Sequence, residues 1–253
     1  MVSATDIEET LCSMGNDEQR IVLQRFFKTG KGQYAEGDKF IGLRVPQTRM
    51  VVRSARRQVP FPEIHKLLIS PLHEVRLAGF LLLVEEMNNA IPKRDEPMTA
   101  HAARRKEIVD FYLAHARNAN NWDLVDNSCP TIVGKFLLFP TPDGSLPSRD
   151  ILDSLAASDN LWEQRIAIVS NWQLIHAGQY DDILRIADKL INQRHDLIHK
   201  AIGWMLREVG KSDIESLRDF LDSRAPYLPR TTLRYAIERM DESERQYWLK
   251  RKV

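Results

Sequence analysis

Helical periodicity runs along almost the whole chain. Apolar residues recur at steps of three and four positions, the spacing that places them on one face of an α-helix. Segments with this spacing cover residues 6–14, 18–27, 46–58, 62–68, 74–87, 102–117, 123–138, 150–156, 161–177, 180–191, 197–209, 214–221, 231–240 and 242–249. No segment alternates apolar and polar residues over the length of a half-buried strand. The pattern therefore predicts an all-α protein built of helix pairs.

Helix starts and connections support this prediction. Proline in the first turn or serine at the N-cap marks several expected starts: Pro46, Pro62, Ser148, Ser158 and Ser212. Two connections are long, the Gly-rich segment 28–45 and the Pro-rich segment 139–147. Because the helical pattern resumes unchanged after the second one, we expect a single domain over residues 1–253.

Four of the expected helices share a short motif, a basic residue followed by small and apolar residues. The basic residues are Arg76, Arg165, Lys200 and Arg234. The last three are spaced by 35 and 34 positions, close to the length of a helix-hairpin repeat. This spacing favours an α-solenoid of HEAT-like repeats with a concave basic cradle. The alternative is that a basic residue before an apolar run is simply a common helix composition.

Chemistry-bearing residues fall on the same repeat register. One slightly longer unit before Arg165, the register reaches Asp126, with Trp122 one turn earlier on the same helical face. Trp204 lies one turn after Lys200. Two indoles and a carboxylate suit a flat, cationic ligand. Each residue also has a simpler interpretation, since large aromatics are commonly core residues and Asp126 and Arg165 could form a structural ion pair.

Composition excludes several classes of protein. Lys and Arg total 36 against 35 Asp and Glu, so the net charge of +1 gives no sign of a nucleic-acid partner by itself. Two cysteines cannot make a disulfide framework or a Cys-rich zinc site. Apolar runs are far too short for a membrane span, and the N-terminus lacks the order of a signal peptide. We expect a cytoplasmic protein without metal or membrane association.

Four motifs, taken in order, resemble the AlkD-like DNA alkylation-repair glycosylase family. They are YAEGDKFIGLRVPQTR from Tyr34, NNWDLVD from Asn120, LWEQRIAIV from Leu161 and HKAIGWMLRE from His199. The family has a single HEAT-like domain and removes N3- and N7-alkylated purines from duplex DNA. The resemblance implies that Asp126 is the catalytic carboxylate, with Trp122, Trp204 and Arg165 as the other site residues. It implies no cofactor, and we expect a monomer bound to double-stranded DNA, associated with the bacterial nucleoid.

Cations for DNA binding are expected along the same molecule. Arg49, Arg53 and Arg57 recur at four-residue steps, so they share one helical face, although a solvated helix face is the commoner fate of such a run. We expect the track to continue through Arg76, Lys200, Arg207 and Arg234, all as phosphate contacts. By resemblance, Gln47 and Thr48 lie near the DNA.

Two other functions remain open from the sequence. The first is a non-catalytic HEAT-like module that binds damaged or branched DNA through the same cations. The second is a protein-binding solenoid without a nucleic-acid role, which the near-neutral net charge favours. Asp126, Trp122, Trp204 and Arg165 separate the glycosylase from both, because binding alone does not require a carboxylate among cations.

Overall fold

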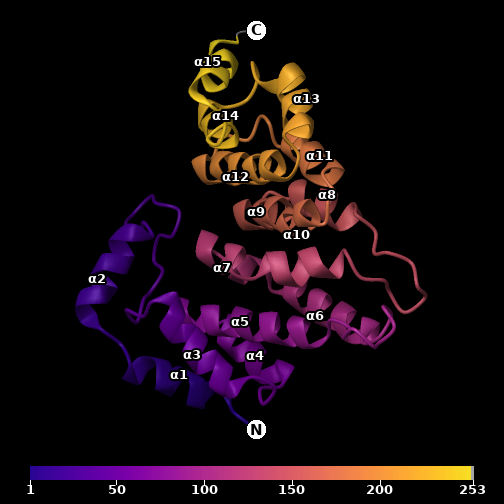
Figure 1. The fold of residues 1–253 in the computed structure, drawn as a ribbon. Coiled ribbons are helices and arrows are strands. Elements are labelled where there is room, and N and C mark those ends of the chain that lie inside the picture. Colours follow the sequence, from indigo (N-terminus) through magenta and orange to yellow (C-terminus); the bar gives the residue numbers. More distant parts are fainter. Residues whose placement is uncertain (252–253) are drawn as a thin grey trace. The chain divides into compact units, whose positions relative to one another are not determined.

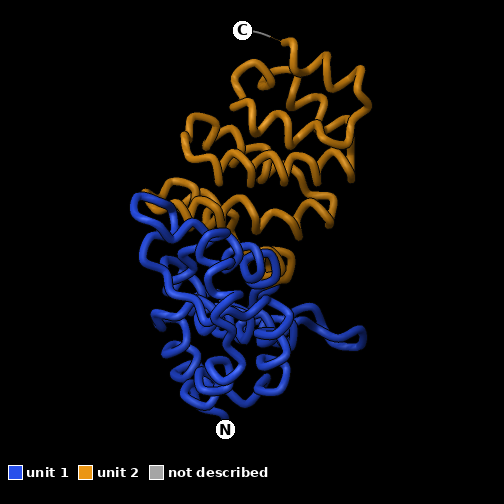
Figure 2. The backbone as a smooth tube through the Cα atoms, turned by 90° about the vertical axis from the view of Figure 1, so that its left-hand side faces the viewer, with its two compact units in different colours: residues 1–132, 141–144 blue, residues 133–140, 145–253 orange. Residues whose placement is uncertain are grey.

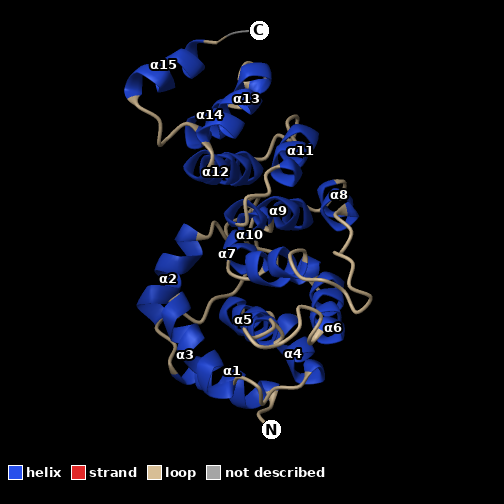
Figure 3. Cartoon of the chain, turned by 45° about the vertical axis from the view of Figure 1, so that its right-hand side comes forward, coloured by secondary structure: helices blue, strands red, loops and turns tan. Residues whose placement is uncertain are grey.

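A computed structural model describes residues 1–251, and within this range the chain folds into α-helices joined by loops, without strands (Figures 1 and 3). The first helices are α1 (Ala4–Ser13), α2 (Asp17–Phe26), α3 (Val45–Ala55), α4 (Phe61–Leu68), α5 (His73–Asn89), α6 (Ala102–Ala114), the 3-10 helix η1 (Ala116–Asn118), α7 (Trp122–Asp126) and the π-helix η2 (Pro130–Gly134). They are followed by α8 (Asp150–Ala156), α9 (Leu161–Val169), α10 (Asn171–His176), α11 (Asp181–Lys189), α12 (Asp196–Ser212), α13 (Ile214–Arg224), α14 (Arg230–Ala236) and α15 (Glu242–Lys250). The expected all-α class is therefore confirmed.

The chain divides into two compact units, shown in different colours in Figure 2. The first unit comprises residues 1–132 and 141–144, and the second comprises residues 133–140 and 145–253. The expectation of one domain over the whole chain, and that of a concave cradle, stay predictions.

In the first unit, α5 is the central helix, with α1, α3, α4, α6 and α7 packed against it. Every residue from His73 to Val84 is buried. A helix enclosed on all sides is apolar around its circumference, which explains why its sequence lacks a single apolar face. Close packing shows at Gly79, where an added Cβ would lie 2.8 Å from Leu68 Cδ2.

In the second unit, α12 has the central position. It packs against α9, α13 and α14, and α8, α9 and α11 also contact one another. Helices α12 and α14 pack closely at Gly203, where an added Cβ would lie 2.5 Å from Tyr235 Cβ and 2.7 Å from the carbonyl oxygen of Thr232 on α14. Helices α9, α12 and α14 carry Arg165, Lys200 and Arg234, so the spacing of 35 and 34 positions corresponds to successive packed helices of this unit.

Most predicted helices match the structure to within a few residues, but two predicted helices are divided. The segment 161–177 is two helices, α9 and α10, and the segment 123–138 is α7 followed by a π-helix. The three expected serine N-caps differ as well, because Arg149 is at the N-cap of α8 and because Asn160 and Asp213 cap α9 and α13. Among residues 1–251, no helix is long and apolar enough to cross a membrane.

Candidate functional site

The short helix α7 carries two of the predicted site residues, Trp122 at its start and Asp126 at its end. The buried side chain of Asn121 caps the helix by accepting a hydrogen bond from the Trp122 amide. Pro130 explains why the helix ends at Asp126. Proline has no N–H to donate to the carbonyl four residues earlier, and its ring crowds that carbonyl. Trp122 and Asp126 therefore occupy opposite ends of one turn and share a face.

Trp122 is half-buried among aromatic side chains of the N-terminal segment. Its ring lies 5.2 Å from that of Phe27 and 5.9 Å from that of Phe26, measured between centroids. The indole Nε1 donates a hydrogen bond of 3.2 Å to the hydroxyl of Tyr34. These contacts fix the indole from one side. Tyr34 begins the first of the four motifs, so the structure links that motif directly to Trp122.

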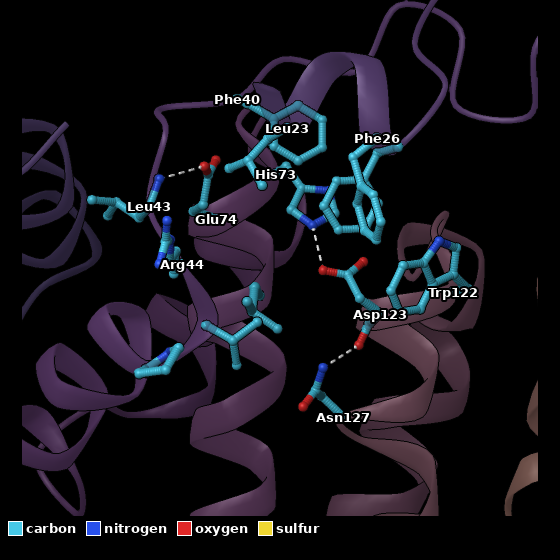
Figure 4. A pocket seen from close by; sticks show the side chains of 14 residues that line it. Leu23, Phe26, Phe40, Leu43, Arg44, His73, Glu74, Trp122, Asp123 and Asn127 are labelled. Carbon is cyan, nitrogen blue, oxygen red and sulfur yellow. Dashed lines mark hydrogen bonds and ion pairs between the residues drawn. The ribbon is translucent and has the colours of Figure 1, made fainter. Parts of the chain in front are cut away.

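The residue after Trp122 is tied to a buried charge network formed by Asp38, His73, Arg76 and Asp123, which we call the His73 network. His73 Nε2 lies 2.9 Å from Asp123 Oδ2, and His73 Nδ1 lies 3.0 Å from Asp38 Oδ2. Arg76 donates to Asp38 at 2.6 Å. All four side chains are at most 6% exposed. The network joins the loop before α3, the first turn of α5 and helix α7. Figure 4 shows its contact between His73 and Asp123.

The His73 network holds a protonated imidazole at neutral pH. Burial alone would lower the pKa of His73, but Asp123 and Asp38 on its two ring nitrogens raise the pKa from 6.5 to about 9. Burial would raise the pKa of Asp38, yet hydrogen bonding to His73 and the charge of Arg76 hold it below the ordinary value. Two cations and two carboxylates thus neutralise one another inside the first unit.

Glu74, the next residue on α5, holds the backbone of the loop in place. Its carboxylate accepts hydrogen bonds of 2.9, 2.9 and 3.0 Å from the amides of Ile41, Gly42 and Leu43. Glu74 is 1% exposed. Gly42 has a φ of +97°, and an added Cβ there would lie 2.1 Å from the carbonyl oxygen of Asn16. Only glycine fits this crossing, which accounts for glycine in the first motif.

The other end of α7 is fixed by contacts of the next two residues, Asn127 and Ser128. Asn127 donates through Nδ2 to the Asp123 carbonyl at 2.8 Å and accepts at Oδ1 from Arg49 of α3 at 2.9 Å. The buried hydroxyl of Ser128 lies 3.1 Å from the hydroxyl of Tyr112 on α6. Asp126 lies directly before these two residues and is half-buried. Contacts on both sides of Asp126 thus fix the backbone that carries it.

A pocket of about 300 Å³ opens beside Trp122 in the first unit. It is mostly apolar, and its walls come from α2, α3, α5, α7 and the loop before α3 (Figure 4). The residues that line it are Leu23, Phe26, Phe27, Phe40, Leu43, Arg44, Val45, Pro46, His73, Glu74, Leu77, Trp122, Asp123 and Asn127. Neither Asp126 nor Tyr34 belongs to this lining.

The remaining two predicted site residues belong to the second unit. Arg165 on α9 is 5% exposed and donates through Nη1 to the carbonyl of Leu197, at 2.6 Å, in the first turn of α12. Trp204 on α12 is half-buried and follows Gly203, where α12 packs closely against α14. Trp122 and Asp126 share one helix, and Arg165 and Trp204 lie on two packed helices. The common site of all four stays a prediction.

Among the predicted DNA-binding residues, some side chains are exposed and others form ion pairs. Arg53 and Arg57 are exposed, and Arg57 donates to Asn89. Lys200 pairs with Asp196 at 2.7 Å, and Arg207 pairs with Glu238. Arg234 is exposed on α14.

The predictions for two of these residues, Thr48 and Arg76, are wrong because both side chains are buried. Thr48 is 0% exposed and faces the core of the first unit, because it lies on the inner side of α3. Arg76 is 5% exposed and bound to Asp38 and to the Ser70 carbonyl. Neither side chain is available to a phosphate. Gln47 beside Thr48 accepts from the Arg44 amide and so caps α3.

Sequence reasoning missed His73, Glu74 and Asp123 as residues that support the site. Their partners lie between 31 and 50 positions away in the chain, beyond the reach of helical periodicity. One signal was present. The His-Glu pair starts a helix whose following residues are nearly all apolar, and buried charged residues need partners.

Comparisons with known proteins agree with this architecture. The model of a family described as DNA alkylation repair enzyme matches residues 7–240. A solved structure described as a predicted DNA alkylation repair enzyme from Enterococcus faecalis superposes with a TM-score of 0.64 at 15% identity. The match covers 90% of this chain and 97% of that one, and at this identity it shows the fold alone. None of the curated proteins matches the chain.

Proposed function

The chain belongs to the family of DNA alkylation repair enzymes, and from this premise we propose that it is a DNA glycosylase that releases cationic N3- and N7-alkylated purines. The substrates would be bases such as 3-methyladenine and 7-methylguanine in duplex DNA. Membership of the family supports a role in the repair of alkylation damage. The identity of the reaction and of the lesions is our proposal, and it rests on the chemistry of Asp126 and its surroundings.

The proposed reaction suits a site with one carboxylate. An N3- or N7-alkylated purine carries a positive charge and leaves as a neutral base, so it needs no acid to protonate it. As the N-glycosidic bond breaks, positive charge develops on the deoxyribose, as in other glycosyl transfers. A fixed carboxylate near the sugar stabilises this oxocarbenium-like transition state and orients the attacking water. Asp126 would have this role.

The observation that carries the proposal is the way in which α7 is held. Asn121 caps the start of the helix, and Asp123 contacts His73 of α5. Asn127 accepts a hydrogen bond from Arg49 of α3, and Ser128 contacts Tyr112 of α6. Electrostatic catalysis depends on groups that are already oriented before the reaction, because reorientation during the reaction would cancel the gain. A short helix anchored on both sides of Asp126 fulfils this condition.

The aromatic and basic residues would hold the DNA around the lesion. Trp122 and Trp204 present indole faces, which attract a cationic base or sugar. Arg165 is 5% exposed and donates to the Leu197 carbonyl, so contact with a phosphate beside the lesion would require its guanidinium to turn outward on DNA binding. Arg53 and Arg57 are exposed in and just after α3 and would contact phosphates without regard to sequence. That all of them act on one lesion is part of the proposal.

Base release from defined duplexes tests the proposal. One duplex carries a single N7-methylguanine, a second carries a neutral lesion such as hypoxanthine, and a third is undamaged. We expect release of 7-methylguanine only, because no group is assigned to protonate a neutral leaving base. Binding of all three duplexes with no base release would instead identify a non-catalytic DNA-binding module. Absence of DNA binding at low salt would exclude both functions.

A further inference from the structure

Helix α7 is so short that its direction depends on its contacts with the rest of the first unit. It has 5 residues, and an isolated helix of that length is not stable in water. It packs against α5, and a buried contact of 2.9 Å joins His73 Nε2 on α5 to Asp123 Oδ2 (Figure 4). Asp123 and Asp126 are three positions apart, so they are neighbours on the helix surface. A rotation of α7 that moves Asp123 therefore moves Asp126 as well.

The two carboxylates on the imidazole of His73 depend on it unequally. Asp38 lies 3.0 Å from Nδ1 and also accepts a hydrogen bond of 2.6 Å from Arg76. Asp123 contacts Nε2 through Oδ2, and its Oδ1 has no hydrogen-bond partner among the described residues. Loss of the Nδ1 contact would leave Asp38 bound to Arg76. Loss of the Nε2 contact would leave the Asp123 carboxylate without its donor.

The imidazole is itself held in one orientation. The ring of Phe40 is stacked on it at 4.3 Å, and the ring of Phe27 lies 5.2 Å away. Apolar side chains of similar volume often stabilise a core as well as a buried ion network does. A charge-assisted hydrogen bond differs from such packing because it fixes the distance and the direction of its acceptor. His73 therefore forms a rigid link from α5 to α7.

We propose that His73 is a positioning residue for the carboxylate of Asp126, with its Nε2 side fixing α7 for the reaction and its Nδ1 side fixing the loop before α3. The proposal rests on the proposed function, because base release is one of its two readouts. His73 acts only through Asp123 and the helix. A misplacement of about 1 Å can cost about 100-fold in rate, so loss of the Nε2 contact should slow base release without weakening DNA binding.

Two variants separate the two sides of the imidazole. The amide nitrogen of asparagine takes the place of Nδ1 and that of glutamine the place of Nε2, so His73→Asn keeps the contact with Asp38 and His73→Gln the contact with Asp123. Both remove the charge. With enzyme in excess, we expect 7-methylguanine release to be about tenfold or more slower for His73→Asn than for His73→Gln, at the same half-saturating DNA concentration. The control His176→Asn, at an exposed position on α10, should match the wild type.

Amide hydrogen exchange in the free protein is the second readout, and it requires neither DNA nor activity. The backbone amides of Val125 and Asn127 form the hydrogen bonds of the single turn of α7. We expect them to exchange about tenfold or more faster in His73→Asn than in His73→Gln. The amide of Leu81, in the buried part of α5, reports on unfolding of the whole unit and should exchange equally in both variants.

The expected differences in both readouts would support the proposal. Equal release rates for His73→Asn and His73→Gln, or a difference only in DNA binding, would overturn it and retain the proposed function. Absence of release by the wild type would reject the proposed function, and the exchange of α7 would then decide the positioning role: faster exchange in His73→Asn supports it and equal exchange overturns it. If His73→Asn does not fold, Asp123→Ala and Asp38→Ala make the same comparison, and the first should be the slower in release.

Discussion

The His73 network makes the stability of the first unit depend on pH in a defined direction. The pKa of His73 is raised from 6.5 in the unfolded chain to about 9 in the folded one. The stabilisation is therefore complete below pH 6.5, and it is lost as the pH rises through 9. Each unit of difference between the folded and unfolded pKa corresponds to about 1.36 kcal/mol, so the stabilisation amounts to roughly 3 kcal/mol. That is a large part of the free energy of unfolding of an ordinary domain, about 5–15 kcal/mol.

Urea unfolding of the wild type and of His73→Gln, from pH 6 to pH 10, measures this effect. The neutral amide leaves the carboxylates of Asp38 and Asp123 without their shared cation. We expect the variant to be less stable than the wild type at pH 6, and the difference to shrink by about 3 kcal/mol by pH 10. The matched control is His176→Gln, at an exposed position on α10. A difference that is the same at both pH values would refute the charge assignment.

Two further predictions concern the loop before α3 and the cations of that helix. In Glu74→Gln, the new side-chain NH₂ group faces backbone N–H groups that donate to a carboxylate in the wild type. We therefore expect the free energy of unfolding to fall by about 2–3 kcal/mol. The control Glu107→Gln, at an exposed position, should leave it unchanged. If Glu74→Gln has the same free energy of unfolding as the wild type, water replaces the three hydrogen bonds and they do not stabilise the loop. Arg53→Ala should reduce the slope of log K for DNA binding against log salt by about one, whereas Arg94→Ala, in an exposed loop, should not. Equal slopes for all three proteins would remove Arg53 from the DNA contacts.

Local pattern was sufficient for the helices but not for their interruptions. Apolar spacing located nearly all of them, because most bury one face and expose the other. The same spacing predicted one helix over residues 123–138, because apolar residues continue after Pro130. The structure ends α7 at Asp126, since proline lacks the N–H that would continue the helix. The caps were displaced by one or two residues, because serine, asparagine and aspartate lie together at those starts and all can accept the bond.

The role of a charged residue was predictable only where its helix has an exposed face. On α3, Arg53 is exposed, as the four-residue spacing of the arginines predicts. Thr48, which only the family resemblance placed near the DNA, is buried on the opposite side of the same helix. On α5 every position from His73 to Val84 is buried, so periodicity could not show that Arg76 points inward. Its partner Asp38 lies 38 positions earlier, in a loop. Contacts over such separations follow from the fold and not from local pattern.

Asp126 carries the charge stabilisation on which the proposed reaction depends most directly. The decisive measurement is the single-turnover rate of 7-methylguanine release from duplex DNA by the wild type and by Asp126→Asn, with Asp110→Asn at an exposed position as the control. Equal DNA binding by all three proteins establishes that only the chemical step is compared. We expect a decrease of about 100- to 1,000-fold for Asp126→Asn and none for Asp110→Asn. Release at the wild-type rate by Asp126→Asn would contradict this expectation.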